Sequence, residues 1–374
     1  MSKSKLKIGL MGLAAKPIPP TSGNICAPNE IVYRIALGLT KVGHEVVVFT
    51  GKDSASELNK VSAGLKSTWH QYGTDTELDA ATFKKKKEEY ENILANEAVK
   101  YFKDGKIDLI HSHDFRISPP IFAAHNVFTL YTVHGDLTGN PLANDSNHLN
   151  ILRNKNFGFL NISSDNVNFC IKNKLRSVAL TPNGIDTDKF GFSNKKRTGI
   201  LVVARMIGVK KIKEVIDIAF ELKEQITLIG PEGPSEEDKA YFADLKANYF
   251  TKSNVFYVGY LPQDKIIPYY QKARVMLFIS ESEGMPLSIL EAQSTGLPVV
   301  ANKVGGVKDI IIDNKTGCFI DDIGNIDEIK QKIIKAGKIK PAECRENIVM
   351  NYSYEKMVKN YIQAYNKFLR SCNG

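Results

Sequence analysis

The chain has 374 residues, which is too long for one ordinary domain and predicts two. A hydrophobic content of 43% and a charged content of 24% are those of a globular protein and exclude a disordered chain. The formal net charge of +9 favours an anionic ligand, which could be nucleotide phosphates, nucleic acid or an anionic membrane surface. The five cysteines are scattered and odd in number, which argues against a disulfide framework and a structural zinc site.

Short apolar runs alternate with helix-length segments in the first half of the chain. The predicted strands are 7–13, 45–50, 107–111, 128–134, 157–163 and 177–181. An amphipathic helix is expected over 29–42, with Gly43 ending it. The apolar stretch 8–15 is short for a signal peptide and is interpreted as a buried strand. We therefore expect a cytoplasmic protein.

The same alternation continues in the second half. The predicted strands are 199–205, 225–229, 255–260, 275–279, 298–301 and 318–320, and helices are expected at 287–294 and 354–368. Near-continuous apolar runs such as ILVVA are typical of parallel strands covered by helices on both faces. The fold class is therefore α/β, with two doubly wound Rossmann-like domains. The polar stretch 186–197 is the best candidate for a linker between them.

Two glutamates follow the predicted strand 275–279, where ligands of an open parallel sheet bind. Glu283 lies in the turn, and Glu291 lies eight residues later inside a helix. The backbone amides around 285–288 would form an anion site suited to a phosphate. The carboxylates could then accept hydrogen bonds from a hexose and a ribose. Alternatively, Glu283 caps the helix and Glu291 is a solvated charge.

Two cations lie at the end of the predicted strand 199–205 and on the loop after it. Arg205 ends that strand, and Lys210 lies on the loop after it. Together they could bring two positive charges to one point and stabilise a departing diphosphate. The alternative is that both are ordinary surface cations of a basic protein.

An ordered set of short motifs resembles the family 4 glycosyltransferases, which have the GT-B fold. The matching pieces are GHEVVVFT, IDLIHSHD, TVHG and TPNGID, then Arg205 with Lys210, VGYLP, EGMPLSILEA and GGVKDIIIDNKTGCFI. The resemblance implies two Rossmann-like domains that face a central cleft. The first, 1–187, would be completed by the C-terminal helix 353–374 and take the acceptor. The second, 188–352, would bind a nucleotide-sugar donor.

The resemblance also assigns roles to single residues. Glu283 would bind hydroxyls of the transferred sugar, and Glu291 would bind the ribose. The residues implied in catalysis are His134, Arg205, Lys210 and Glu283. The residues implied in donor binding are Gly23, Arg205, Lys210, Gly284, Met285, Pro286, Leu287 and Glu291.

Two positions depart from the family pattern. The loop 17–28 has the single Gly23 where the family commonly has a Gly-Gly pair close to the donor phosphates. This loop either contacts the donor or shapes the acceptor site. Lys211 stands where a glycine commonly follows the lysine, which could alter the local turn.

The function implied is transfer of a hexose-type sugar, with retention and without a metal or cofactor, from a nucleotide-diphosphate sugar. The acceptor would be a saccharide, a lipid-linked sugar or a small molecule, and helix 83–106 could associate weakly with the inner membrane face. A GT-B nucleotide-sugar epimerase and a non-catalytic sugar-nucleotide-binding protein stay as alternatives. Dinucleotide binding is disfavoured because no GxGxxG follows the first strand. Nucleic-acid binding has only the charge in its favour.

Overall fold

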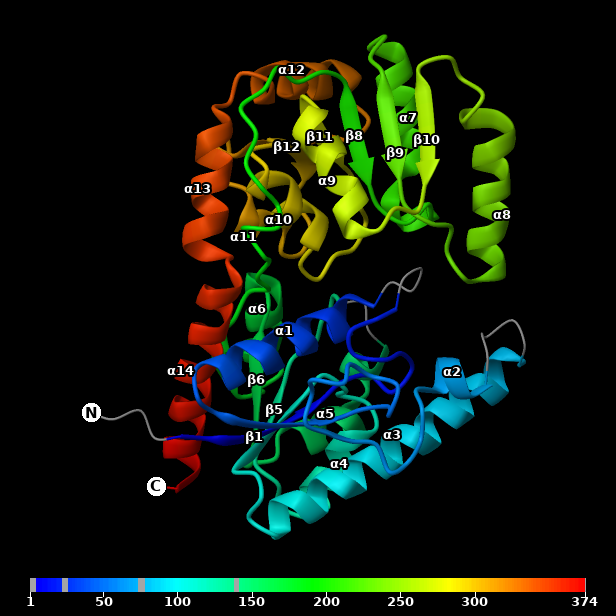
Figure 1. The fold of residues 1–374 in the computed structure, drawn as a ribbon. Helices are drawn as coiled ribbons and strands as arrows, with labels where there is room; N and C mark the ends of the chain where they lie inside the picture. Colours follow the sequence, from blue (N-terminus) through cyan, green and yellow to red (C-terminus); the bar gives the residue numbers. More distant parts are fainter. Residues whose placement is uncertain (1–4, 22–25, 73–77, 138–140, 374) are drawn as a thin grey trace. The chain divides into compact units, whose positions relative to one another are not determined.

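The computed structural model describes residues 5–21, 26–72, 78–137 and 141–373. The chain divides into two compact units, Met1–Asn183 with Tyr354–Gly374 (the N-terminal unit) and Gly184–Ser353 (the C-terminal unit). The division expected from the sequence had its boundaries after 187 and before 353. Each unit has a parallel sheet with helices between its strands, which confirms the α/β fold class (Figure 1).

Within the described residues, the sheet of the N-terminal unit has seven parallel strands in the order β3-β2-β1-β4-β5-β6-β7. Their bounds are β1 (Lys7–Met11), β2 (Glu45–Phe49), β3 (Lys60–Val61), β4 (Leu109–Ser112), β5 (Thr129–Tyr131), β6 (Phe157–Asn161) and β7 (Ser177–Leu180). All but β3 were predicted. That edge strand has only two residues, both half-buried, and so lacks the apolar run that marks the others.

The helices of the N-terminal unit include the C-terminal segment of the chain. They are α1 (Ala27–Lys41), α2 (Thr68–Tyr72), α3 (Ala80–Lys103), α4 (Ser118–Ala124), α5 (Ser146–Leu152), α6 (Ser164–Lys172) and α14 (Tyr354–Asn373), with the 3₁₀ turn η1 (Pro141–Asn144). Helix α14 packs against α1 at Gly38, where a Cβ atom would lie 2.3 Å from the side chain of Val358. Glycine at this position therefore allows the two helices to approach closely.

The sheet of the C-terminal unit has six parallel strands in the order β10-β9-β8-β11-β12-β13. Their bounds are β8 (Ile200–Val203), β9 (Ile226–Ile229), β10 (Val255–Gly259), β11 (Val275–Phe278), β12 (Val299–Asn302) and β13 (Gly317–Ile320). The helices are α7 (Ile212–Glu221), α8 (Glu236–Asp244), α9 (Gln263–Lys272), α10 (Leu287–Ser294), α11 (Val307–Ile310), α12 (Ile326–Ala336) and α13 (Pro341–Asn351), with the short turns η2 (Gly208–Lys210) and η3 (Leu245–Tyr249). Every strand predicted in this half is present.

The strand order reverses once in each sheet. In the N-terminal unit the reversal lies between β1 and β4, and in the C-terminal unit it lies between β8 and β11. Ligands of open parallel sheets bind outside the carboxyl ends of the strands at such a switch point. These two places are therefore where functional side chains are expected.

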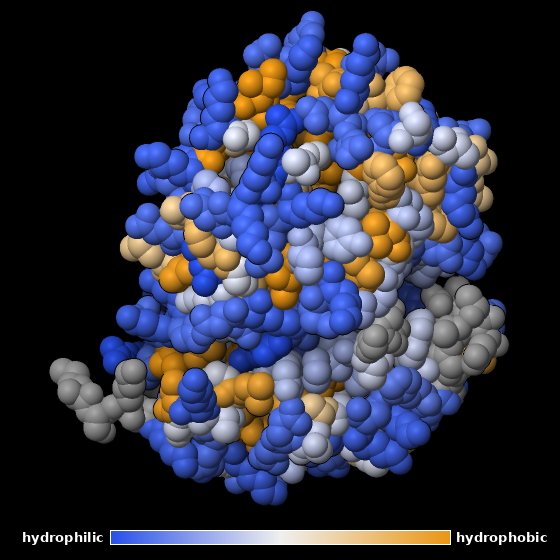
Figure 2. Space-filling model, turned by 45° about the horizontal axis from the view of Figure 1, so that its top comes forward, coloured by the Kyte–Doolittle hydropathy of each residue, from blue (hydrophilic) through white to orange (hydrophobic). Residues whose placement is uncertain are grey.

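The strands next to the switch points are buried on both faces. Every residue of β4 and β11 is buried; β11 is an apolar run, whereas β4 includes the polar His111 and Ser112. Hydrophilic residues predominate on the face drawn in Figure 2, where hydrophobic residues form scattered patches. Within the described part of the chain, no helix combines the length and the apolar character that crossing a bilayer requires.

Candidate functional site

Two loops meet at the switch point of the C-terminal unit. The loop after β8 carries Lys210, and the turn after β11 carries Glu283. The backbone N–H of Glu281 donates to the carbonyl of Val209 at 2.9 Å, which ties the loops together. Lys210 Nζ forms an ion pair with Glu283 Oε1, and the two side chains are only 14% and 10% exposed. The structure therefore brings together two of the residues predicted for the site.

Two glycines hold the Glu283 turn from the other side. The N–H of Gly306 donates to the carbonyl of Gly284 at 2.8 Å. A Cβ atom on Gly305 would lie 1.9 Å from the carbonyl oxygen of Glu283, so only glycine allows this approach. Asn302, at the end of β12, accepts a hydrogen bond from the N–H of Ser280 and donates to its carbonyl, at 3.0 and 2.8 Å. Backbone and side-chain contacts thus fix the turn.

Helix α10 begins directly after this turn. Its first residue is Leu287, and Pro286 precedes it with an extended backbone. Among the described residues, no side chain caps the helix, so Glu283 does not have the capping role considered as an alternative. The unsatisfied amides of a helix N-terminus carry partial positive charge and favour an anion. Met285 and Pro286 are buried and Leu287 is half-buried.

Arg205 and Lys211 differ from Lys210 in their surroundings. Arg205 is exposed, and its guanidinium has no carboxylate partner within the residues that the structure describes. Lys211 adopts a left-handed conformation with φ of +50° and forms an ion pair with Glu281. A non-glycine residue costs about 1 kcal/mol in this conformation. The glycine common in the family is thus replaced by a lysine in the conformation that favours glycine.

Glu291 lies inside α10 and is only 8% exposed. Its Oε1 accepts a hydrogen bond from Gln263 Nε2 at 3.0 Å, and its Oε2 accepts one from the Tyr270 hydroxyl at 2.8 Å. Burial and the neighbouring Glu291 carboxylate raise the pKa of Tyr270 well above its ordinary value, so Tyr270 stays a donor. The interpretation of Glu291 as a solvated charge is therefore wrong, because this carboxylate is buried and hydrogen-bonded.

His134 is the one predicted catalytic residue in the N-terminal unit. It follows β5 and is half-buried, with its Nε2 2.6 Å from Nδ1 of His113, which follows β4. The buried His111 of β4 interacts with the hydroxyls of Thr132 and Tyr365, both at 2.8 Å. Burial lowers the pKa of His111 to about 3 and of His134 to about 4, and that of His113 well below its ordinary value. All three imidazoles are neutral at pH 7.

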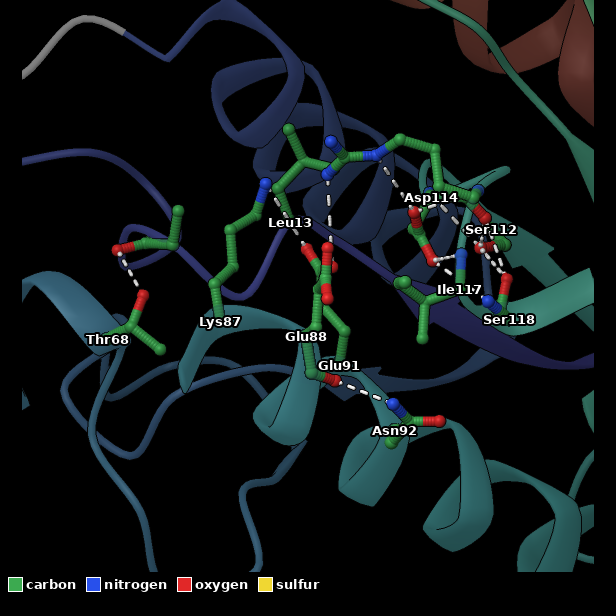
Figure 3. Close-up of polar contacts among 12 residues, drawn as sticks. Leu13, Thr68, Lys87, Glu88, Glu91, Asn92, Ser112, Asp114, Ile117 and Ser118 are labelled. Carbon is green, nitrogen blue, oxygen red and sulfur yellow. Dashed lines mark hydrogen bonds and ion pairs between the residues drawn. The ribbon is translucent and has the colours of Figure 1, made fainter. Parts of the chain in front are cut away.

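A second ionisable group is buried at the switch point of the N-terminal unit (Figure 3). Glu91 of α3 is fully buried, with Lys87 Nζ 3.7 Å from its Oε1 and Arg116 Nη2 3.8 Å from its Oε2. Asp114 beside it accepts three backbone N–H groups at the start of α4, each at 3.0 Å. Burial first, and then the Asp114 charge, raise the pKa of Glu91 to about 7, and the two cations oppose this rise.

Sequence reasoning missed several of these residues. His113 lies in the quoted HSHD motif, but its partner is set by the pairing of β4 with β5. Glu91 lies on the apolar face of its helix, one turn before the buried Leu94, and that spacing was the available signal. The predicted Gly23 lies outside the described residues. Within those residues, no cluster of three or more His, Cys, Asp or Glu side chains could hold a metal ion.

Known protein families match both halves of the chain. A sequence model described as Glycosyltransferase Family 4 matches residues 29–189, and one described as Glycosyl transferases group 1 matches residues 185–352. N-acetyl-alpha-D-glucosaminyl L-malate synthase of Bacillus anthracis is 24% identical over 191 residues, which are 49% of this chain and 48% of that protein. The chain thus spans about half the length of the first curated relatives it matches.

Solved structures match nearly the whole chain. Sucrose-phosphate synthase from Thermosynechococcus elongatus has a TM-score of 0.73 at 18% identity, with 97% of this chain and 99% of that chain covered. Anabaena Alr3699/HepE, in complex with UDP and glucose, has a TM-score of 0.70 at 14% identity, with 96% and 99% covered. At these identities the likeness shows the fold, which is that of two Rossmann-like domains of the GT-B class.

Proposed function

Since the chain belongs to the family 4 glycosyltransferases, we propose that it transfers a hexose-type sugar from a nucleotide-diphosphate sugar to an acceptor, with retention of configuration. One observation carries the proposal for the donor. The Lys210–Glu283 ion pair lies at the switch point between β8 and β11, on the turn that leads into the N-terminus of α10. A cation, a carboxylate and a helix N-terminus at one place suit a ligand that has both a diphosphate and a sugar.

The diphosphate is assigned to the positive groups of this site. Lys210, Arg205 and the first amides of α10 stabilise the charge that develops on the departing diphosphate. Arg205 is exposed and without a carboxylate partner among the described residues, so it is available to an anion. These cations take the role that a divalent metal has in other transferases, and we propose that turnover needs no metal.

The two glutamates are assigned to hydroxyl groups of the donor. Glu283 binds the transferred sugar and Glu291 binds the ribose. An ionised carboxylate has about four acceptor positions. Glu283 can therefore hold Lys210 and a sugar hydroxyl together, and Glu291 can accept a ribose hydroxyl besides Tyr270 and Gln263.

The proposed reaction conserves the anomeric configuration because departure and attack take place on the same face. The bond between the anomeric carbon and the diphosphate oxygen breaks, and its electron pair goes to that oxygen. The acceptor hydroxyl forms the new bond to the anomeric carbon, and its proton passes to the leaving diphosphate. We assign the acceptor to the N-terminal unit.

The test is a binding and turnover assay with the full chain. Because a neighbour of the same fold is solved with UDP and glucose, uridine diphosphate sugars are the first donors in the panel. We expect one nucleotide diphosphate and its sugar to raise the melting temperature, since a ligand of the folded state stabilises it. Release of nucleotide diphosphate with a glycosylated product should persist in EDTA.

Other results of the same assay would favour the alternatives. Stabilisation without any product would indicate a sugar-nucleotide-binding protein, and a changed nucleotide sugar without an acceptor would indicate an epimerase. If EDTA abolishes turnover and magnesium or manganese restores it, the assignment of the diphosphate to Arg205 and Lys210 is wrong. If no nucleotide diphosphate or its sugar raises the melting temperature, the donor site itself is wrong.

A further inference from the structure

His113 and His134 form a hydrogen-bonded pair whose role the proposed function does not assign. Their rings are stacked, with centroids 4.9 Å apart and planes inclined by 14°. His113 Nδ1 and His134 Nε2 are 2.6 Å apart, which is a close contact between two nitrogens. Because both imidazoles are neutral, one nitrogen of this contact carries the proton and the other accepts it. The direction of the bond therefore fixes the tautomer of both rings.

The other nitrogen of His113 decides that direction. His113 is only 4% exposed, and its Nε2 has no hydrogen-bond partner among the residues that the structure describes. If His113 accepted at Nδ1, its own proton would be on Nε2, as a buried N–H group without an acceptor. Orphaned N–H groups are rare in folded proteins, and an acceptor without a donor is tolerated more often. His113 thus donates from Nδ1, and His134 accepts at Nε2.

We propose that His113 is a positioning residue that holds His134 as the tautomer with its proton on Nδ1. His134 then offers an N–H donor to a substrate, because its Nε2 is occupied by His113. The group that this N–H meets must accept a hydrogen bond. It is a hydroxyl or phosphate oxygen of the nucleotide sugar or of the substrate that receives the sugar. This catalytic consequence depends on the proposed function, whereas the tautomer is a property of the free protein.

Neighbouring groups keep His113 in place for this role. The N–H of His113 donates to the carbonyl of Met11 in β1 at 2.9 Å. The ring of His111 lies 4.4 Å from that of His113 and is itself in contact with Thr132 and with Tyr365 of α14. The pair therefore rests on three strands and the C-terminal helix, so the orientation of His134 does not depend on a single loop.

The experiment measures the tautomer directly. The full chain is labelled with ¹⁵N-histidine, and the Nδ1 and Nε2 shifts of His134 are recorded for the wild type, His113→Phe and His113→Asn. We expect Nδ1–H in the wild type and in His113→Asn, whose amide can donate in place of Nδ1. In His113→Phe the donor is lost, and the Nε2–H form should become populated. His148→Phe, a change of another buried histidine in the same unit, should leave these shifts unaltered.

Turnover gives the second readout. His113→Phe should lower kcat by about tenfold, the scale of one hydrogen bond, while His113→Asn keeps most of it. An Nε2–H signal for His134 in the wild type would overturn the inference even if the variants fail to fold. An unchanged tautomer in folded His113→Phe would overturn it as well. If the tautomer is as expected and no donor supports transfer, the proposed function fails and the positioning role stands.

Discussion

At the switch point of the C-terminal unit the charged side chains keep some contact with solvent, whereas at that of the N-terminal unit Glu91, Asp114 and His113 are buried and the cation Arg116 is exposed. Arg205 is exposed, and Lys210 and Glu283 pair with each other while partly accessible. In the N-terminal unit His113 and Glu91 are withdrawn from water. The first arrangement keeps its charges and suits a charged ligand such as a diphosphate. The second holds a neutral histidine pair and the buried Glu91 carboxyl, whose pKa is raised to about 7, so the charge of Glu91 should depend on pH near neutrality.

The two buried glutamates show the same contrast at single residues. Glu291 is 8% exposed and accepts hydrogen bonds from a hydroxyl and an amide. Glu91 is 0% exposed, and the groups that oppose its burial are the Ala14 backbone and cations at 3.7 and 3.8 Å. Burial of an ionised carboxylate destabilises the folded state most when no hydrogen bonds within the protein replace those that the carboxylate made to water. Glu91 should therefore be the glutamate that limits stability at neutral and higher pH.

The largest expected effect concerns Glu91. Burial raises its pKa to about 7 from an ordinary value of 4.5. A raised carboxyl pKa means that the folded state holds the proton more tightly than the unfolded state. The contribution to stability is full below pH 4.5 and is lost as the pH rises through 7, with a total of about 3 kcal/mol.

The neutral variant Glu91→Gln should remove this dependence. Melting of the wild type and the variant from pH 5 to 8.5 should show a fall of roughly 5–10 °C in the wild type that the variant lacks. Glu89→Gln, on the same helix but exposed, should keep the wild-type slope. Equal slopes for Glu91→Gln and the wild type would mean that Glu91 is ionised in the folded protein without cost, and the contrast with Glu291 would be lost.

The next effect tests the charges of the C-terminal unit. Arg205→Ala and Lys210→Ala should each lower turnover by about 10²-fold, the scale of one preorganised electrostatic donor. Arg205→Ala should leave the melting temperature unchanged because that side chain is exposed. Lys210→Ala should also lower the melting temperature, since Glu283 is then left without its partner.

The exposed Lys338 provides a matched control, because Lys338→Ala removes the same charge from the same unit away from the loops. Its turnover and melting temperature should equal those of the wild type. Near-normal turnover in folded Arg205→Ala and Lys210→Ala would make both residues ordinary surface cations.

The sequence predicted the fold better than the pairing of side chains. Strands such as β8 and β11 were identified because burial on both faces demands an uninterrupted apolar run. Arg205, Lys210 and Glu283 were predicted for the site because they follow strands, where parallel sheets position ligands, and the structure brings the last two together. The pairing of His113 with His134 depends on which strands become neighbours, which local pattern does not encode.

Burial of single polar groups was also beyond sequence reasoning. A glutamate within a helix is usually solvated, so nothing local distinguishes Glu291 from a surface charge, and for Glu91 the apolar face of its helix is the one local signal. Their burial depends on contacts from other elements, such as Tyr270 of α9 for Glu291 and the loop after β4 for Glu91. Such contacts appear only when the elements are packed together.

The smallest expected effect separates the two glutamates of the C-terminal unit by the ligand that each one holds. Glu291 is assigned to the ribose, which is present in both the nucleotide diphosphate and its sugar. Glu283 is assigned to the transferred sugar alone. Loss of hydrogen bonds to a charged acceptor costs about 1.5–3 kcal/mol, or roughly one to two decades in affinity. Glu291→Ala should thus weaken both ligands by similar factors, and Glu283→Ala should weaken only the nucleotide sugar.

Calorimetric titration of both ligands against both variants gives the four dissociation constants that decide these assignments. Glu291→Gln is the control for folding, because Glu291→Ala also removes the acceptor of the Tyr270 hydroxyl and could loosen α9 against α10. Glu283→Ala releases Lys210 from its ion pair, so the affinity of this variant for the bare nucleotide diphosphate should stay equal or rise. If Glu283→Ala lowers the affinity for both ligands equally, the Glu283 carboxylate of the wild type acts on diphosphate binding, by holding Lys210 in place. Its assignment to the sugar would then be wrong.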